Sequence, residues 1–222
     1  MKPLVIFDLD GTLADTADDV VAAINHTLEA EGVAPLHLGP ERYLVGSGGR
    51  ALIKRAYAQA GRVLDDDVLE RVFQTFLKRY EANVAVHSQL YPGAQMALEE
   101  LAAAGFNLAI CTNKSYRPCC ALLEALQITH FFSAICGNDS LPWSKPDPRA
   151  LLGVVERAGG LQSRSLMVGD SRTDIDTGMA AAIPVVAVDF GYSDRPVAEL
   201  KPDYVISTFE ALIPIVRKSL AR

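Results

Sequence analysis

Short apolar runs without polar alternation recur along the chain. They occupy residues 4–7, 106–111, 133–136, 165–169, 184–188 and 204–206. Runs of this kind are typical of strands that are buried on both faces of a parallel sheet. Segments with apolar residues at helical spacing lie between several of them, at 94–104, 117–127 and 147–158. The alternation predicts an α/β fold with a doubly wound, Rossmann-like parallel sheet.

Residues 16–87 interrupt this alternation. Apolar positions recur at helical spacing over 16–31, 49–60 and 65–82, and no strand pattern separates these segments. A helical block between the first and second strands indicates an insertion with its own packing. We therefore predict a small α-helical domain at residues 16–87, inserted into an α/β core domain formed by residues 1–15 and 88–222.

Polar clusters follow three of the predicted strands. Their sequences are Asp8-Leu9-Asp10-Gly11-Thr12, Thr112-Asn113-Lys114 and Asp170-Ser171-Arg172-Thr173-Asp174. Because ligands bind at the carboxyl ends of the strands in an open parallel sheet, we expect these clusters to converge on one site.

Four carboxylates of these clusters are candidates for a metal site: Asp8, Asp10, Asp170 and Asp174. An extended chain directs Asp8 and Asp10 to the same side, and carboxylates this close need a nearby positive charge. Carboxylate oxygens suit Mg²⁺. A single aspartate would be interpreted as a helix cap or a turn residue, but the joint pattern predicts a magnesium site.

These residues also carry a family resemblance. The stretch Asp8-Leu9-Asp10-Gly11-Thr12-Leu13 with Asp15-Thr16 resembles the first motif of the haloacid dehalogenase superfamily of phosphohydrolases. Thr112, Lys145 in Ser144-Lys145-Pro146-Asp147-Pro148, and the stretch Gly169–Asp174 resemble its second, third and fourth motifs. The four motifs occur in order over nearly the whole chain. Within the superfamily, the chain is most similar to the phosphoglycolate phosphatase group.

The resemblance implies catalytic roles for four residues. Asp8 is the expected nucleophile, which forms an aspartyl-phosphate. Asp10 is the expected general acid and then the general base, because a poor alkoxide leaving group needs a proton. Thr112 is expected to hydrogen-bond a phosphate oxygen, and Lys145 to neutralise charge and hold Asp8 in place.

The resemblance also implies a set of binding residues. Phosphate contacts are expected from Gly11, Thr12, Thr112, Asn113 and Lys145. Mg²⁺ is expected to bind Asp8, Asp10 through its backbone carbonyl, and Asp170, while Asp174 orders Lys145 or metal-bound water.

Arg50 is a candidate specificity residue in the helical insert. It follows Gly46-Ser47-Gly48-Gly49, where a helix is expected to begin. An arginine there can pair with a substrate carboxylate. The alternative is a glycine turn followed by an exposed helix arginine, and the sequence leaves both open.

The favoured function is a Mg²⁺-dependent, phosphoglycolate phosphatase-like hydrolysis of a small phosphorylated metabolite. A β-phosphoglucomutase-like hexose-phosphate mutase, a pyrophosphatase and a sugar-phosphate phosphatase remain compatible with the same motifs. A binding module without catalysis is disfavoured, because it has no physical need for an acidic cluster that is unfavourable without a cation.

The composition of the chain limits the kinds of partner that it is expected to bind. The 222 residues carry 21 Lys and Arg against 27 Asp and Glu, a net charge of −6, which argues against nucleic-acid binding. The first apolar run is too short for a signal peptide, and no run approaches ~18 apolar residues, so no membrane partner is expected. Four cysteines without CxxC spacing favour reduced thiols and a cytoplasmic location. The oligomeric state stays open between monomer and homodimer.

Overall fold

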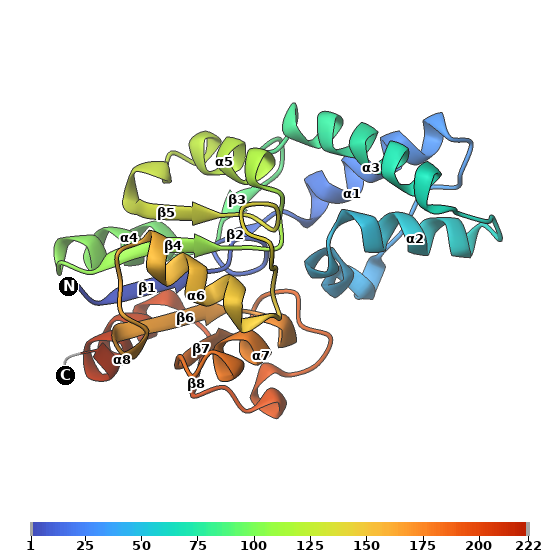
Figure 1. Cartoon of the computed structure of the whole chain (residues 1–222). Helices are drawn as coiled ribbons and strands as arrows, with labels where there is room; N and C mark the ends of the chain where they lie inside the picture. Colours follow the sequence, from blue (N-terminus) through green and yellow to red (C-terminus); the bar gives the residue numbers. More distant parts are fainter. Residues whose placement is uncertain (1, 221–222) are drawn as a thin grey trace.

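The computed structural model describes residues 2–220 and contains the expected six-stranded parallel sheet. In space the strand order is β5-β4-β1-β6-β7-β8, as Figure 1 shows. The strands are β1 (Leu4–Phe7), β4 (Asn107–Cys111), β5 (Phe132–Cys136), β6 (Ser165–Gly169), β7 (Val185–Val188) and β8 (Tyr204–Ile206). The predicted α/β, doubly wound fold is confirmed.

The alternating side chains of β1 separate two layers of the core. Val5 and Phe7 belong to one buried apolar cluster, and Leu4 and Ile6 belong to a second. Side chains of α4 (Ala94–Ala103), α5 (Tyr116–Ala125) and α8 (Leu212–Leu220) join the first cluster. Side chains of α6 (Pro148–Arg157) and α7 (Arg172–Ala180) join the second. The period of two along a strand therefore places helices on both faces of the sheet.

Strand β1 lies at the point where the direction of winding reverses. It pairs in parallel with β4 on one side and with β6 on the other. After β5 the chain returns to the centre of the sheet as β6 and then continues outward through β7 and β8. A crevice forms at the carboxyl ends of strands around such a switch point, so the segments after β1, β4 and β6 are brought together there.

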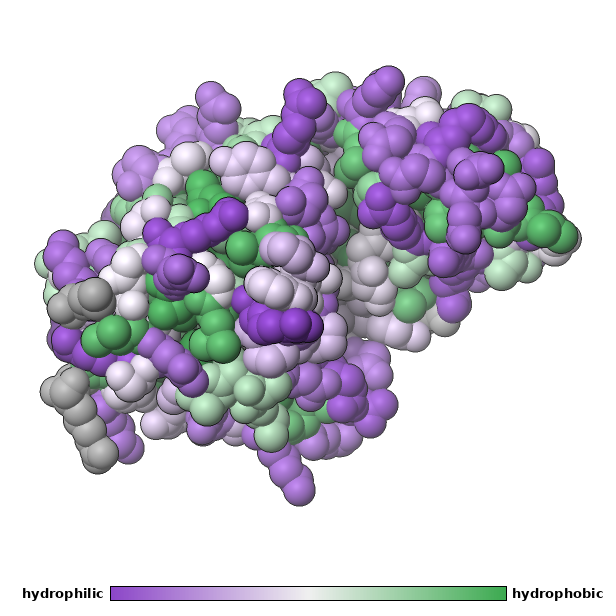
Figure 2. All heavy atoms as spheres, viewed as in Figure 1, coloured by the Kyte–Doolittle hydropathy of each residue, from purple (hydrophilic) through white to green (hydrophobic). Residues whose placement is uncertain are grey.

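The segment between β1 and β4 is mainly helical. It contains α1 (Ala17–Ala30), the 3₁₀ segment η1 (Gly39–Ser47), α2 (Gly49–Gln59) and α3 (Asp66–Glu81). These helices lie beyond one end of the sheet in Figure 1. In the view of Figure 2 their surface, at the upper right, is largely hydrophilic. Their apolar residues, among them Leu52, Val72 and Phe76, are buried.

A small antiparallel pair of strands joins the insert to the sheet. It consists of β2 (Ala14–Asp15) and β3 (Gln89–Leu90). The buried carboxylate of Asp19 at the start of α1 accepts hydrogen bonds from the backbone N–H groups of His87 and Ser88. The two connecting segments are therefore tied together close to the limits of the predicted inserted domain. The division into residues 1–15 with 88–222 and residues 16–87 stays a prediction.

Short 3₁₀ segments complete the chain. They are η2 (Thr129–Phe131), η3 (Gln162–Arg164), η4 (Val197–Leu200) and η5 (Phe209–Ala211). Within residues 2–220, no helix is long and apolar enough to cross a membrane.

Candidate active site

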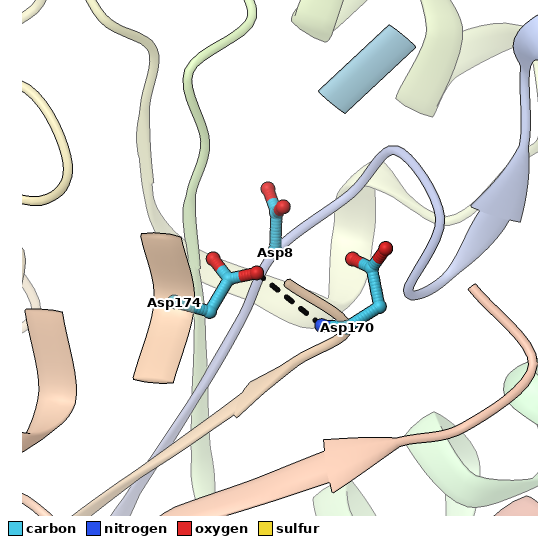
Figure 3. A group of neighbouring side chains, drawn as sticks. All are labelled: Asp8, Asp170 and Asp174. Atoms are coloured by element: carbon cyan, nitrogen blue, oxygen red, sulfur yellow. Dashed lines mark hydrogen bonds between the residues drawn. The ribbon is translucent and has the colours of Figure 1, made fainter. Parts of the chain in front are cut away.

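Three buried carboxylates meet at the carboxyl end of the sheet. Asp8 directly follows β1, Asp170 directly follows β6, and Asp174 lies in the first turn of α7. Each offers a carboxylate oxygen, and these oxygens all lie within 4.8 Å of one another. Figure 3 shows the three side chains around one point. The structure thus brings together residues that are more than 160 positions apart in the sequence.

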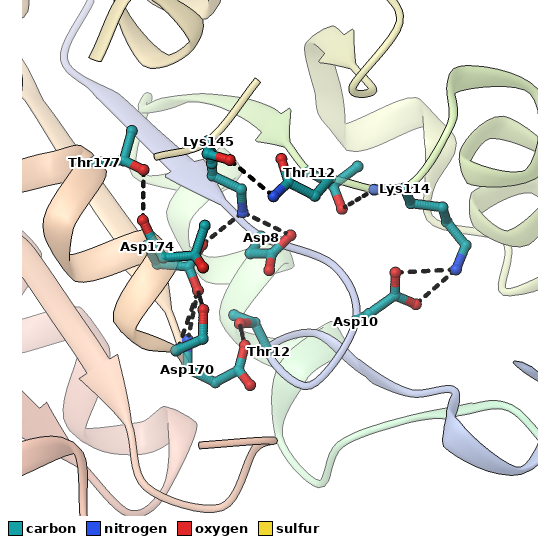
Figure 4. A network of polar contacts seen from close by, with 12 residues as sticks. Asp8, Asp10, Thr12, Thr112, Lys114, Lys145, Asp170, Asp174 and Thr177 are labelled. Carbon is teal, nitrogen blue, oxygen red and sulfur yellow. Dashed lines mark hydrogen bonds and ion pairs between the residues drawn. The ribbon is translucent and has the colours of Figure 1, made fainter. Parts of the chain in front are cut away.

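Lys145 lies between two of these carboxylates. Its Nζ is 2.5 Å from Asp174 Oδ1 and 3.1 Å from Asp8 Oδ1 (Figure 4). The contact with Asp8 is an ion pair outside hydrogen-bond geometry, so the buried Asp8 Oδ1 accepts no hydrogen bond. Burial alone lowers the pKa of Lys145, but Asp174 and Asp8 outweigh it, and the pKa is raised above its ordinary value. Lys145 therefore stays charged.

Asp8 is held in an environment that disfavours its charge. Burial is the main cause that raises the pKa of this carboxyl to about 6, and the negative charges of Asp174 and Asp10 add to it. The attraction of Lys145 acts in the opposite direction and is weaker. The carboxylate of Asp8 therefore needs more positive charge than Lys145 supplies.

Asp170 is fixed by donors on both of its oxygens. Thr12 Oγ1 donates to Oδ1 at 2.7 Å, and the Tyr192 backbone N–H donates to Oδ2 at 2.6 Å. Burial, followed by the charges of Asp174 and Asp8, raises the pKa of Asp170 well above its ordinary value. The Thr12 hydroxyl, which the family resemblance assigns to phosphate, is directed at Asp170 in this structure.

Asp174 uses both oxygens within the protein. Its Oδ1 accepts from Lys145, and its Oδ2 accepts from the hydroxyl of Ser171 at 2.6 Å and from the Ser171 backbone N–H at 3.1 Å. Ser171 and Asp174 form a capping box at the start of α7. Asp174 therefore holds Lys145 with one oxygen and caps α7 with the other.

Asp10 points toward a second lysine. Lys114 Nζ lies 2.7 Å from Asp10 Oδ1 and 3.0 Å from Oδ2, and the Thr16 hydroxyl donates to Oδ1 at 2.5 Å (Figure 4). Burial alone lowers the pKa of Lys114, but the neighbouring Asp10 raises it above the ordinary value. Sequence reasoning placed Lys114 in the polar cluster after β4 but gave it no role.

Tyr192 is another residue that sequence reasoning missed. Its backbone N–H binds Asp170, while its hydroxyl accepts from the backbone N–H groups of Thr16 at 2.7 Å and Ala17 at 2.9 Å. The same hydroxyl donates to Asp15 Oδ1 at 2.6 Å. One residue therefore links the carboxylate after β6, through its backbone, to the start of the helical insert, through its hydroxyl. No sequence pattern signals this link, because Tyr192 and Asp15 are 177 positions apart.

A cavity of about 270 Å³ opens beside these groups. Asp8, Asp10, Thr112, Asn113 and Lys114 line it from the sheet side. The insert supplies the opposite wall, which includes Val45, Gly46, Ser47, Gly48, Gly49, Arg50, Phe73, Phe76 and Tyr80. Of the predicted phosphate-binding residues, Thr112 and Asn113 line the cavity, whereas Gly11, Thr12 and Lys145 lie outside its lining.

Arg50 lines the cavity but already has partners. Its guanidinium donates to Glu70 Oε2 at 2.9 and 3.3 Å, and it stacks over the Phe73 ring at 3.6 Å from the centroid. The arginine is exposed, and so is Glu70. The predicted contact of Arg50 with a substrate carboxylate stays a prediction.

Gly11 permits the close approach of the first loop to Asp170. It has φ +84°, and a Cβ built there would collide with the Asp170 carboxylate and lie 2.8 Å from Tyr192 Cδ2. Gly105 is a matched control, because it has φ +86° and open space around the same position.

We expect Gly105→Ala to cost about 1 kcal/mol of unfolding free energy, the penalty of the left-handed conformation. Gly11→Ala should cost about 2–4 kcal/mol, since it adds overpacking against Asp170. Urea unfolding of both variants measures the difference. Equal costs for the two variants would show that the close approach to Asp170 does not constrain the loop.

The fold and the site together define a class of hydrolases. In this class a parallel α/β sheet carries carboxylates and a lysine at its switch point, and a helical insert lies next to them. The model of the haloacid dehalogenase-like hydrolase family matches residues 5–188. The chain belongs to this family, and the resemblance seen in its motifs is confirmed.

Full-length relatives agree with this assignment. The chain is 48% identical to a phosphoglycolate phosphatase of Mesorhizobium japonicum over 221 residues, which covers 100% of this chain and 97% of the relative. It is 44% identical to a phosphoglycolate phosphatase of Agrobacterium fabrum, and the match covers 99% of this chain and 94% of the relative. A crystal structure of a predicted phosphoglycolate phosphatase from Haemophilus somnus superimposes with a TM-score of 0.89 at 32% identity, covering 96% and 97% of the two chains.

Proposed function

We propose that this hydrolase is a Mg²⁺-dependent phosphatase that hydrolyses phosphoglycolate through an aspartyl-phosphate on Asp8. The observation that carries the proposal is the position of the Asp8 carboxylate, at the floor of the cavity and in contact with Lys145. The full-length similarity to phosphatases named for phosphoglycolate supports the choice of substrate.

The residues present fit a divalent cation. Three buried carboxylates and one ammonium group leave a local charge of −3 + 1 = −2. The buried Asp8 Oδ1 accepts no hydrogen bond, and both Asp8 and Asp170 have raised pKa values. We propose that Asp8, Asp170 and the backbone carbonyl of Asp10 hold Mg²⁺, with Asp174 behind them. When bound, the ion would supply the missing positive charge for the carboxylates and the phosphate.

In the first half-reaction, an oxygen of Asp8 attacks phosphorus and the bond from phosphorus to the ester oxygen breaks. Asp10 gives its proton to the leaving alkoxide, which departs as an alcohol. Lys145 holds Asp8 and balances charge on the transferring group. Thr112 and the backbone N–H of Asn113 would donate hydrogen bonds to phosphate oxygens, and both residues line the cavity together with Asp8.

In the second half-reaction, Asp10 takes a proton from water. The resulting hydroxide attacks the phosphorus of the aspartyl-phosphate, and the bond from phosphorus to the Asp8 oxygen breaks. Phosphate leaves, Asp8 is regenerated as a carboxylate, and Asp10 is again protonated.

A panel of phosphate compounds tests this function. We expect hydrolysis of phosphoglycolate to exceed that of hexose phosphates and pyrophosphate, and chelation to lower it at least ~10²-fold, with recovery on addition of Mg²⁺. Release of inorganic phosphate is the measurement. Conversion of one hexose phosphate into another without phosphate release would instead identify a mutase, and full activity in excess chelator would refute the metal role.

A further inference from the structure

Lys114 is a buried cation in the wall of the cavity. Its side chain is only 6% exposed, and it lies in the loop after β4, two residues beyond Thr112. Its ammonium contacts both oxygens of Asp10, at 2.7 and 3.0 Å. An ammonium has three N–H donors. The two contacts with Asp10 leave a third donor, which can interact with the neighbouring Tyr80 hydroxyl or with an acceptor on a ligand.

Tyr80 lies beside Lys114 on the insert side of the cavity. Lys114 Nζ is 4.5 Å from the centroid of the Tyr80 ring. The Tyr80 hydroxyl is buried and makes no hydrogen bond of normal geometry, although the Lys114 ammonium is its neighbour. An ammonium has no acceptor, so Lys114 cannot accept the proton of this hydroxyl. A buried donor without an acceptor is costly, so the position of Tyr80 indicates a ligand that would accept that proton.

The location of this pair matches the shape of a phosphorylated 2-hydroxy acid. In such an ester the carboxylate carbon is two bonds from the ester oxygen, and Asp10 is the residue proposed to protonate that oxygen. Because Lys114 contacts Asp10 directly, its ammonium would be within reach of the group beyond the ester oxygen. A carboxylate there would accept hydrogen bonds from an ammonium and a phenol, which are strong when one partner is charged.

We propose that Lys114 and Tyr80 form the subsite for the substrate's carboxylate and thereby select phosphate esters of 2-hydroxy acids. The inference rests on the proposed function of the site. Of the described residues that line the cavity, Arg50 is the other basic one. Its guanidinium is 45% exposed and already paired with Glu70, which a substrate would have to displace. A buried cation discriminates a charged ligand more strongly than an exposed one does.

The test compares phosphoglycolate with ethyl phosphate, which has a methyl group in place of the carboxylate. We expect the native chain to prefer phosphoglycolate in kcat/KM. Lys114→Met should reduce the ratio of the two kcat/KM values ~10- to 10²-fold, and Tyr80→Phe should reduce it about threefold to tenfold. Lys78→Met, an exposed lysine of the same helix as Tyr80, is the matched control and should leave the ratio unchanged.

The ratio of the two kcat/KM values shows whether Lys114 binds the substrate's carboxylate or only positions Asp10. If Lys114→Met lowers kcat/KM equally for both esters, Lys114 only positions Asp10 and the subsite is refuted. If Arg50→Ala removes the preference and Lys114→Met does not, Arg50 reads the carboxylate. If the native chain hydrolyses neither ester in the presence of Mg²⁺, the proposed function itself is refuted. This result differs from the two outcomes above, which concern only the carboxylate subsite.

A calorimetric titration gives a readout independent of turnover. Asp8→Asn and the double variant Asp8→Asn with Lys114→Met would each be titrated with phosphoglycolate and with ethyl phosphate. We expect Lys114→Met to weaken the binding of phosphoglycolate at least ~10-fold and to change the binding of ethyl phosphate little. Equal weakening of both ligands would overturn the proposal. Urea unfolding of the same samples establishes that each variant is folded.

Discussion

Replacing Asp8 with asparagine is expected to lower kcat/KM for phosphoglycolate at least ~10³-fold, and also to stabilise the chelated protein at pH 7. The loss of turnover follows because an amide cannot act as the nucleophile that forms the phosphoenzyme. The gain in stability follows because Asp8 is buried with a charge that Lys145 compensates only in part. A proposed nucleophile that is buried in this way would reduce stability in favour of function.

The sign of the pH dependence follows from the raised pKa. The folded protein binds a proton on Asp8 up to about pH 6, whereas the ordinary value is 3.8. The folded state therefore binds more protons between these values, and the destabilisation by Asp8 grows as the pH rises from about 4 to 6. We expect Asp8→Asn to gain on the order of 1–3 kcal/mol at pH 7 and almost nothing near pH 4.

The measurements are phosphate release with Mg²⁺ and urea unfolding in excess chelator at pH 4 and pH 7. Asp176→Asn is the matched control, because Asp176 is an exposed carboxylate on α7. It should change neither property by more than about 0.5 kcal/mol in free energy. Undiminished hydrolysis by Asp8→Asn would refute the nucleophile, and a loss of stability at pH 7 would refute the burial argument.

Replacing Lys145 with methionine is expected to be the most destabilising of the substitutions considered. The variant leaves Asp174 and Asp8 without their cation, and Asp174 is fully buried. Removing one partner of a buried ion pair costs about 3–5 kcal/mol. For a chain of this length each kcal/mol lowers Tm by about 2–4 °C, so Tm should fall by roughly 6–20 °C. Turnover should fall at least ~10²-fold as well.

Thermal and urea unfolding of the chelated protein measure this effect. Lys54→Met, an exposed lysine on α2, is the control and should cost less than about 0.5 kcal/mol. A double-mutant cycle tests whether Lys145 and Asp8 interact directly. Asp8→Asn should stabilise the Lys145→Met variant more than it stabilises the native chain. A cost below about 1 kcal/mol for Lys145→Met would show that Lys145, Asp8 and Asp174 are not desolvated as described.

The local sequence pattern was sufficient to predict most elements of the α/β core domain. The uninterrupted apolar runs marked β1, β6 and β7 because strands buried on both faces exclude polar residues, and all three are fully buried in the structure. The helical spacing over residues 65–82 also agrees with α3, where Asp65 accepts a hydrogen bond from the Val68 backbone N–H, as an N-cap does. The strand-end rule then identified Asp8 and Asp170 as neighbours.

Some elements carry too weak a local signal to predict. Helix α7 begins with Arg172 and Thr173, followed by Asp174 in its first turn, so apolar periodicity is weak there. Strands β2 and β3 are two residues each and exist only through their pairing with one another. A pair this short has no pattern of its own along the chain.

The sequence by itself determined which residue types could do the chemistry, and the tertiary structure decided which of them touch. Sequence spacing carries no information about contacts such as Asp10 with Lys114, 104 positions apart, or Tyr192 with Asp15, 177 positions apart. Arg50 illustrates the same limit, because its pairing with Glu70 depends on how α2 packs against α3. Local propensity acts over a few residues, whereas the charge and burial that tune a site depend on packing between distant segments.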